Sequence, residues 1–392
     1  MNDIIISPYV QEMEGLFLKL FLKKPELIVR SPGRVNIIGE HTDYNEGFVL
    51  PGSIDMYAYV AVDKGGDDKI NLYSSEYKQQ FVTDKNNIGG KLNSWTDYVI
   101  GVVDQLKKNG HDIGGFNLLL SGNLPIGAGM SSSASVECAV VFALNELFQL
   151  KIDKVDMVKL AQKAEHHFTG VQCGIMDMFA SMFGKKGQVI KLDCRSLEYE
   201  YVPFDLKGIK IVLFNTNVKH SLAATAYNER RRQCEQGLAW VKESFPIVNS
   251  LRDVSLEMLQ EYVATKDALI YQRCKYVVEE NVRLLQGCED LKNGNIQALG
   301  EKMFQTHEGL SHEYEVSCKE LDFLVDSVKD NPDVLGARMM GGGFGGCTIN
   351  LVKEAAIPAL VDRLKKEYFI ATGLKLAVYT GQIENGTEKI IL

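Results

Sequence analysis

One carboxylate near the middle of the chain lies in a strongly apolar segment. Apart from Cys173, Asp177 is the only ionisable acid or base between His167 and Lys185. Burial favours the protonated form of a carboxyl group, whereas a nearby cation favours the ionised form. This competition suits a residue that accepts a proton from a hydroxyl group. The alternative is a structural aspartate, for example one that caps a helix in a buried turn.

A second acidic residue, Glu165, falls within an apolar helical stripe. It shares one face of the helix predicted over 154–168 with Val158, Ala161 and Phe168. A buried carboxylate is unfavourable unless it is paired or binds a metal ion, so Glu165 is a candidate ligand for Mg²⁺. An ordinary surface glutamate at the edge of the stripe is the alternative.

Glycines and serines between a predicted strand and a predicted helix form a candidate phosphate site. Gly127 and Gly129 allow a tight turn and a close approach of the backbone to a ligand. Ser131–Ser133 then place hydroxyls and free N–H groups at the start of a helix over 133–150, where the helix dipole favours anions. No lysine follows, so this is not a Walker A loop, and a serine-capped helix after a glycine turn is the alternative.

A third glycine-rich segment, Gly341–Gly346, matches the spacing of a dinucleotide-binding turn. Such a turn must open a helix, but the residues that follow, 347–352, alternate like a strand. The sequence therefore excludes a dinucleotide fold here. It also lacks the HRD and DFG motifs of protein kinases.

Polar residues gather in and just beyond an apolar strand near the N-terminus, within the segment 31–47. A loop rich in donors and acceptors suits a sugar, because each sugar hydroxyl needs a partner. A solvated charged loop is the alternative. The polar residues are Arg34, Asn36, Glu40, His41 and Asp43.

The order of strand and helix signals predicts an α+β protein. Strands dominate the first half, helices dominate from about 221 to 330, and the end returns to strand, helix and strand. The change of character near Pro203–Lys207 predicts a boundary between a domain at 1–205 and a domain at 206–392.

Composition excludes several classes of protein. The 392 residues carry a net charge of −8 and show no dense basic run, which argues against nucleic-acid binding. The N-terminus lacks the order of a signal peptide, and the apolar runs are too short to cross a bilayer. Eight cysteines without a CxxC pair predict reduced thiols in a cytoplasmic protein.

Matching motifs occur in one consistent order along nearly the whole chain. Together they resemble the galactokinases of the GHMP small-molecule kinase superfamily. Gly33–Tyr44 looks like the galactokinase signature, Leu124–Ser135 is similar to the superfamily's ATP-binding motif, and Gly336–Cys347 resembles its third motif. Shorter matches lie at 164–177, 193–196, 215–220, 227–231, 311–312, 316–318 and 320–322.

The resemblance implies a role for each candidate residue. Arg34 is the cation beside the reacting oxygens and Asp177 is the catalytic carboxylate. Ser133 and Glu165 serve Mg²⁺. Galactose is held by Glu40, His41, Thr42, Asp43 and Tyr227, with Gly174 close by. The ATP phosphates are wrapped by Gly127, Ala128, Gly129, Met130, Ser131, Ser132 and Ser133.

The resemblance also implies a fold and an activity. The fold has an S5-like N-terminal domain and a ferredoxin-like C-terminal domain, with the active site between them. The activity is transfer of a phosphoryl group from ATP to the C1 hydroxyl of galactose, as in the Leloir pathway. We expect the protein to be a monomer.

There are two alternatives. One is another sugar 1-kinase, which acts on N-acetylgalactosamine or L-arabinose. The other is a non-catalytic galactose sensor. The intact Ser133-Ala134 pair favours an enzyme over a sensor. Met178 replaces the glutamine that usually follows the catalytic aspartate, which predicts a local change in packing.

Overall fold

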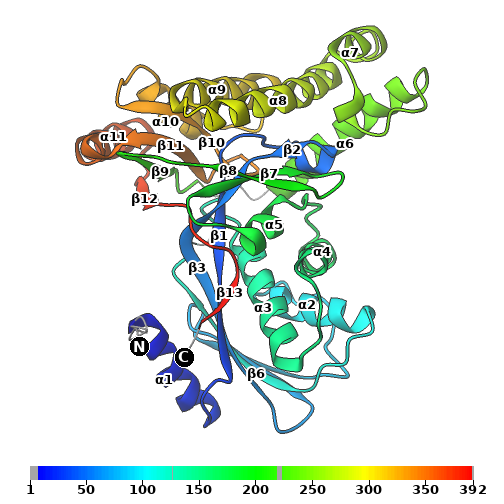
Figure 1. Cartoon of the computed structure of the whole chain (residues 1–392), viewed down its shortest axis with the longest axis vertical. Helices are drawn as coiled ribbons and strands as arrows, with labels where there is room; N and C mark the ends of the chain where they lie inside the picture. The colour runs from blue at the N-terminus through cyan, green and yellow to red at the C-terminus, as the bar shows by residue number, and fades with distance from the viewer. Residues whose placement is uncertain (1–7, 126, 219–222, 391–392) are drawn as a thin grey trace.

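The computed structural model of the protein shows two packed parts, and each is built around one sheet (Figure 1). The structure describes residues 8–125, 127–218 and 223–390. Ile126 of the ATP-binding motif, Lys219 and His220 of a shorter motif, and the start of the helical stretch at 221 lie outside the described residues. Within the described residues, no helix has both the length and the apolar character needed to cross a membrane.

The first sheet has six strands in the order β13-β1-β3-β6-β4-β5, and the pairing is antiparallel except between β4 and β6. Side chains of β1 alternate between its two faces, as the period of a strand requires. Ile28 packs under helix α1 (Pro8–Phe21), whereas Leu27 and Val29 point into the main core. The strands are β1 (Leu27–Asn36), β3 (Pro51–Lys64), β4 (Lys69–Ser74), β5 (Gln79–Asp84), β6 (Phe116–Gly122) and β13 (Glu388–Ile390).

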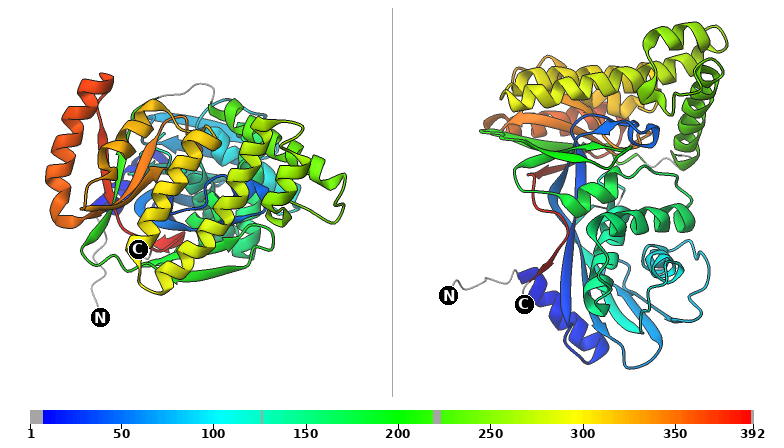
Figure 2. Two further views of the ribbon diagram at one scale, coloured as in Figure 1. Left: turned by 90° about the horizontal axis from the view of Figure 1, so that it is seen from above. Right: turned by 45° about the vertical axis from the view of Figure 1, so that its right-hand side comes forward.

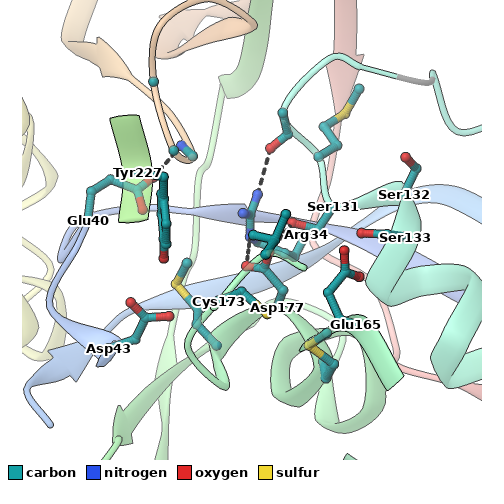
Figure 3. Close-up of a pocket in the computed structure, with 18 of the residues that line it drawn as sticks. Arg34, Glu40, Asp43, Ser131, Ser132, Ser133, Glu165, Cys173, Asp177 and Tyr227 are labelled. Carbon is teal, nitrogen blue, oxygen red and sulfur yellow. Dashed lines mark hydrogen bonds and ion pairs between the residues drawn. The ribbon is translucent and has the colours of Figure 1, made fainter. Parts of the chain in front are cut away.

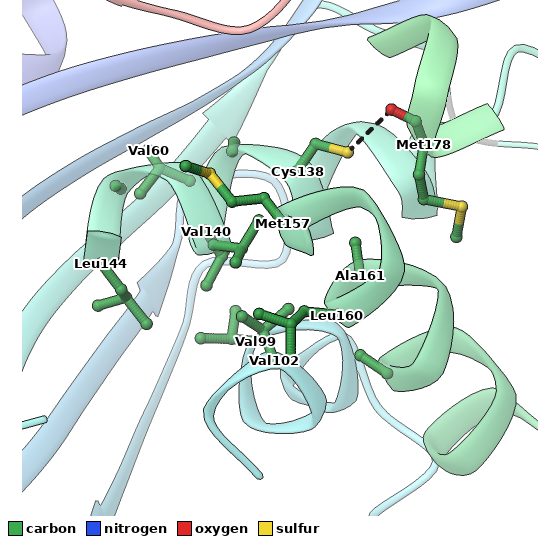
Figure 4. Packing of buried hydrophobic residues seen from close by; sticks show 14 of the residues in the cluster. Val60, Val99, Val102, Cys138, Val140, Leu144, Met157, Leu160, Ala161 and Met178 are labelled. Carbon is green, nitrogen blue, oxygen red and sulfur yellow. Dashed lines mark hydrogen bonds between the residues drawn. The ribbon is translucent and has the colours of Figure 1, made fainter. Parts of the chain in front are cut away.

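Four helices cover the face of this sheet opposite α1. Helix α3 is apolar on nearly every side because it lies between the sheet and helices α2 and α4, and Val140 and Leu144 are fully buried there (Figure 4). The bounds are α2 (Thr96–Lys108), α3 (Ser132–Phe148), α4 (Lys154–Ala164), a π-helical turn (Glu165–Thr169) and α5 (Met176–Phe183).

The second sheet has four antiparallel strands in the order β10-β11-β9-β12. Val212 and Phe214 of β9 face helices α10 and α11, whereas Ile211 and Leu213 face a core that includes side chains of α8, α9 and β1. This second core joins the two parts of the molecule. The bounds are β9 (Ile209–Asn215), β10 (Val334–Met339), β11 (Cys347–Lys353), β12 (Ala377–Gly381), α8 (Ala268–Lys292), α9 (Ile296–Glu308), α10 (Lys319–Lys329) and α11 (Ile357–Thr372).

A smaller sheet and a helical extension complete the molecule (Figure 2). The sheet has the order β2-β7-β8, and the extension packs α6 and α7 against α8. The bounds are β2 (Phe48–Val49), β7 (Gln188–Asp193), β8 (Tyr199–Pro203), α6 (Ala223–Lys242) and α7 (Leu256–Tyr262), with short 3₁₀ or π turns at 43–45, 251–253, 309–313 and 354–356.

The α+β prediction is confirmed, and β11 follows the glycines at 341–346 as a strand. The strand at the start of the chain is longer than the apolar segment 27–30 predicts, because β1 continues through Arg34 to Asn36. The helices α1 and α5 and the strands β2, β5, β10 and β13 were not predicted. The domain boundary between 205 and 206 stays a prediction, although β13 returns from the second half to pair with β1.

The contact between α9 and β10 offers a test of the packing. A Cβ atom added at Gly300 would lie 2.0 Å from the carbonyl oxygen of Leu335, so a backbone would have to move. Gly300→Ala should lower the free energy of unfolding by about 1–3 kcal/mol. Urea denaturation provides the measurement.

The matched control is Gly15→Ala in the exposed part of α1, where an added Cβ meets nothing within 4 Å. It should stabilise the protein by about 0.5–1 kcal/mol, because alanine favours a helix over glycine. Equal effects of the two substitutions would contradict the described packing of α9 on β10.

Candidate active site

A cavity of about 350 Å³ lies where the two parts of the molecule meet. Its walls come from segments far apart in the sequence: β1 and the loop after it, the glycine–serine segment, α5, α6 and the glycines between β10 and β11. The residues that line it include Arg34, Glu40, His41, Asp43, Gly127, Gly129, Met130, Ser131, Ser132, Ser133, Glu165, Cys173, Asp177, Met178, Tyr227, Gly341, Gly342 and Gly343.

The buried guanidinium of Arg34 joins two walls of this cavity (Figure 3). Its Nε donates to Asp177 Oδ1 at 2.7 Å, and its Nη1 donates to the carbonyl oxygen of Gly129 at 2.7 Å. The pairing of β1 with β3 shifts between Pro32 and Arg34, and such bulges re-aim side chains. Despite its burial, the pKa of Arg34 is raised by the negative charges of Asp177 and Glu40. Arg34 is therefore a permanent cation in this site.

Ser131 supports the same carboxylate from the other side. Its hydroxyl donates to Asp177 Oδ2 at 2.6 Å, so both oxygens of Asp177 accept a hydrogen bond. Ser131 precedes α3 with φ of 56°, and its side chain does not cap the helix. The prediction of hydroxyls at this helix start is confirmed, but the bond to Asp177 could not be predicted because it needs the left-handed backbone at Ser131.

Glu40 forms the second buried ion pair of the site. Its carboxylate accepts hydrogen bonds from Arg338 at 3.1 Å, from the N–H of Gly341 at 2.7 Å and from Asn36 at 3.0 Å. Arg338 lowers the pKa of Glu40 against the opposing effect of burial. Sequence reasoning did not identify Arg338, although a lone arginine inside the apolar strand β10 was a visible signal. Glu40 thus anchors the third glycine segment to the loop after β1.

The carboxylate of Asp43 has a raised pKa. Burial and the negative charge of Asp177 raise the pKa of Asp43 to about 7. Gly174 lies directly behind it, because a Cβ atom at Gly174 would stand 1.8 Å from Asp43 Oδ2. A glycine is therefore required at 174 for this carboxylate to keep its place.

His41 and Tyr227 complete the wall beside Asp43. Their ring centroids are 5.2 Å apart, and the two residues come from the loop after β1 and from α6. Burial lowers the pKa of His41 to about 4, so its imidazole is neutral near pH 7.

Three predicted contact residues do not line the cavity. The hydroxyl of Thr42 is used inside the loop, where it donates to the carbonyl oxygens of Gly39 and Phe48. Ala128 is buried in the core that joins the two parts, and Gly174 lies behind Asp43. These three residues support the loops that carry the cavity lining, and their direct contact with a ligand stays a prediction.

Two glutamates on neighbouring helical segments provide a donor set for a divalent cation. Glu165 is buried as its apolar stripe predicted, and its Oε2 has no hydrogen-bond partner within the described residues. Neither oxygen of the buried Glu137 has one there either. Glu165 lies within interaction distance of both Glu137 and Ser133, and burial raises the pKa of both glutamates. Unpaired buried carboxylates beside a hydroxyl fit the hard oxygen ligands of Mg²⁺.

The described residues contain no cluster of three His, Cys, Asp or Glu side chains that could hold a metal ion by itself. A cation bound at Glu165 would therefore need further oxygen ligands, which Mg²⁺ usually takes from phosphates and water.

A second cavity, of about 520 Å³, begins on the other side of the serines. Ser132 and Ser133 line both cavities. The far wall of the second cavity is aromatic, with Tyr77 and Trp95 nearly parallel at 6.5 Å between ring centroids. A ligand with a flat ring and a phosphate chain could therefore extend from one cavity into the other.

Sequence comparisons match this chain to known protein families. Residues 97–185 match the model of the GHMP kinases N terminal domain, and residues 289–370 match that of the GHMP kinases C terminal. Residues 15–64 match the galactokinase galactose-binding signature. Together with the fold, these matches define a GHMP kinase.

Comparison with whole proteins shows which family of GHMP kinases the chain resembles. A galactokinase of Thermotoga petrophila is 42% identical over 363 residues, which are 92% of this chain and 99% of the relative. One of Clostridium beijerinckii is 41% identical and covers 97% of this chain and 99% of its own. The crystal structure of Lactococcus lactis galactokinase complexed with galactose has a TM-score of 0.94 at 34% identity and covers 97% of this chain and 100% of its own. The chain belongs to the galactokinase family.

A more distant neighbour shows only that the fold is shared. A mevalonate kinase structure has a TM-score of 0.64 at 20% identity over 92% of this chain.

The electrostatic coupling within the site can be measured directly. Asp43 should titrate near pH 7, and Asp177→Asn should lower the pKa of Asp43, because the charge of Asp177 is one of the causes that raise it. Carbon NMR of aspartate-labelled protein over pH 4–9 follows this titration. Glu146→Gln, an exposed change on α3, is the control and should leave the pKa of Asp43 in place. An unchanged titration of Asp43 in Asp177→Asn would contradict the coupling.

Proposed function

We propose that the protein transfers the γ-phosphoryl group of MgATP to the C1 hydroxyl of galactose. One observation supports this most strongly: Asp177 is held between Arg34 and Ser131 at the start of a serine-rich helix. That arrangement places a proton acceptor, a fixed cation and an anion-binding helix start around one point, as phosphoryl transfer to a hydroxyl requires.

The nucleotide would occupy both cavities. Its base would lie in the aromatic cavity near Tyr77 and Trp95, and its phosphates would follow the glycine–serine segment to the first cavity. Gly129 already has its carbonyl oxygen fixed by Arg34, so its backbone is held in place before the nucleotide arrives. Free N–H groups at the start of α3 would bind the phosphate oxygens.

Galactose would bind between the loop after β1 and α6. Carboxylates of Glu40 and Asp43 and the rings of His41 and Tyr227 form this part of the wall. The C1 hydroxyl would face Asp177, which would orient it and accept its proton. Arg34 would offset the negative charge shared by Asp177 and the transferring group. Because such transition states are loose, positioning and electrostatics should contribute more than proton removal.

Glu165 and Ser133 would hold Mg²⁺ beside the phosphates, with Glu137 behind them. When bound, the cation would neutralise phosphate charge and orient the terminal phosphoryl group. The two buried carboxylates would gain a partner that the protein itself does not give them.

Met178 stands on the cavity wall and is buried. It therefore contributes an apolar surface close to Asp177.

We further propose that the protein acts as a monomer in the cytoplasm, in galactose metabolism.

Product identification tests the function. Phosphorus NMR after incubation with MgATP and galactose should show galactose 1-phosphate and ADP in equal amounts. N-Acetylgalactosamine and L-arabinose tested in the same way separate the related sugar 1-kinases. Binding of galactose and ATP without any sugar phosphate would instead establish a sensor.

Asp177→Asn keeps the shape of the side chain but removes its charge. We expect kcat to fall by about 100-fold or more, because the proton acceptor and the partner of Arg34 are both lost. The affinity for galactose should change little, because other residues contact most of the sugar. Steady-state kinetics and calorimetric galactose titration measure the two quantities. Near wild-type kcat would exclude Asp177 as the catalytic carboxylate.

Glu165→Gln tests the cation site without depending on turnover. We expect Mn²⁺ bound with ATP, measured by electron paramagnetic resonance, to bind about tenfold or more weakly, because a charged oxygen ligand is lost. Glu146→Gln, on the exposed side of α3, is the matched control and should bind Mn²⁺ normally. If both variants bind alike, the cation lies elsewhere.

A further inference from the structure

The imidazole of His41 lies on the wall of the first cavity with one nitrogen lacking a protein partner. Nε2 is buried and makes no hydrogen bond within the described residues, whereas Nδ1 lies 2.7 Å from Tyr44 Oη. The backbone of His41 has φ of 62°, which is unfavourable for a non-glycine residue and is typically retained where function needs it. The ring is thus held in a fixed position with one nitrogen available to a ligand.

A chain of hydrogen bonds leads from this ring into the protein. Tyr44 Oη lies 2.8 Å from Tyr314 Oη, which lies 3.2 Å from Cys234 Sγ. Tyr314 and Cys234 are fully buried. Burial raises the pKa of both Tyr44 and Tyr314 well above its usual value, so both phenols keep their proton.

The direction of the bond between His41 and Tyr44 determines the direction of the bond between the two phenols, because each phenol carries a single proton. If Tyr44 donates to Nδ1 of His41, then Tyr314 must donate to Tyr44. The neutral imidazole then carries its proton on Nε2. In the opposite direction, Nδ1 carries the proton and Nε2 presents only a lone pair. The bond between Tyr314 and Cys234 can run either way, because Cys234 also interacts with Cys274.

Geometry and chemistry favour the first direction. A separation of 2.7 Å is the most common distance for an O–H donor, whereas it lies at the short end of the range of about 2.7–3.2 Å for N–H donors. An imidazole nitrogen is also a much better acceptor than a phenol oxygen, since it is the stronger base. With Nδ1 accepting from Tyr44, the single proton of the neutral imidazole belongs on Nε2, which has no hydrogen-bond partner within the described residues.

A fixed N–H donor suits the carboxylate beside it. Glu40, whose pKa is lowered against the effect of burial by Arg338, accepts hydrogen bonds but cannot donate them, and the phenol of Tyr227 is another donor on this wall. A sugar hydroxyl that donates its proton to a carboxylate keeps an oxygen with unused lone pairs. A fixed N–H group beside the carboxylates gives that oxygen its partner and disfavours a sugar that lacks the hydroxyl.

We propose that Tyr44 and Tyr314 hold His41 as the Nε2–H tautomer, and that Nε2 donates a hydrogen bond to a hydroxyl oxygen of the sugar. The inference rests on the proposed function, because it takes galactose as the occupant of this wall. Tyr44 and Tyr314 are positioning residues that act through His41.

NMR of the free protein tests the tautomer without any substrate. Long-range proton–nitrogen correlation should show the Nε2 of His41 protonated and its Nδ1 unprotonated at pH 7, with His41→Gln used to assign the signals. A protonated Nδ1 would overturn the proposal. This result would stand even if the wild-type protein made no galactose 1-phosphate, which would refute the proposed function instead.

Kinetics test whether the chain acts through His41. Tyr44→Phe should raise KM for galactose about tenfold with little change in kcat, as expected for one lost hydrogen bond, and Tyr314→Phe should do so to a smaller extent. In a His41→Ala background, Tyr44→Phe should have almost no further effect on KM. A full additional effect in that background would overturn the proposal, because the role of Tyr44 would then be independent of the imidazole.

Tyr368→Phe is the matched control. Tyr368 is as buried as Tyr314 and its hydroxyl donates to the carbonyl oxygen of Thr216 at 2.8 Å, but it belongs to the core under α10 and α11. The Tyr368→Phe variant should be less stable than the wild-type protein but should have the same KM for galactose. A similar rise of KM in Tyr368→Phe and Tyr44→Phe would also overturn the proposal, since it would point to a general loss of stability.

Discussion

The site depends on one buried guanidinium. Arg34 is carried by the long strand β1, and its hydrogen bonds reach Asp177 at the start of α5 and Gly129 in the segment before α3. A buried arginine is tolerated only when its charge and its donors are satisfied. The same contacts that satisfy Arg34 therefore fix the carboxylate and the phosphate-binding backbone relative to each other, which is the arrangement that a phosphoryl transfer needs.

A second buried ion pair links the two parts of the molecule. Glu40 follows β1 and pairs with Arg338 of β10, which belongs to the second sheet. Glu40 also accepts from the N–H of Gly341, so the glycines after β10 are tied to the wall of the cavity. The two parts thus share buried polar contacts as well as an apolar core, and both contribute to one cleft.

The sequence predicted those features that depend on local pattern. Asp177 and Glu165 could be recognised because a charge among apolar residues is visible along the chain, and both are placed at the cavity. The bond from Ser131 to Asp177 depends on backbone angles, and the pairing of Arg338 with Glu40 joins residues 298 positions apart. Neither contact leaves a local trace, although the lone Arg338 within an apolar strand is itself visible in the sequence. The resemblance places Thr42 near the sugar, but it does not show that its hydroxyl bonds within the loop.

The position of β13 has a consequence for how the protein reaches its native state. This strand pairs with the outer edge of β1, and Arg30 bonds to Glu388 across a separation of 358 positions. Closing so long a loop is slow compared with forming local contacts. During synthesis on the ribosome, β1, which carries Arg34, therefore keeps one edge without a paired strand until almost all of the described chain has emerged. Until then, that edge is open to pairing with other chains.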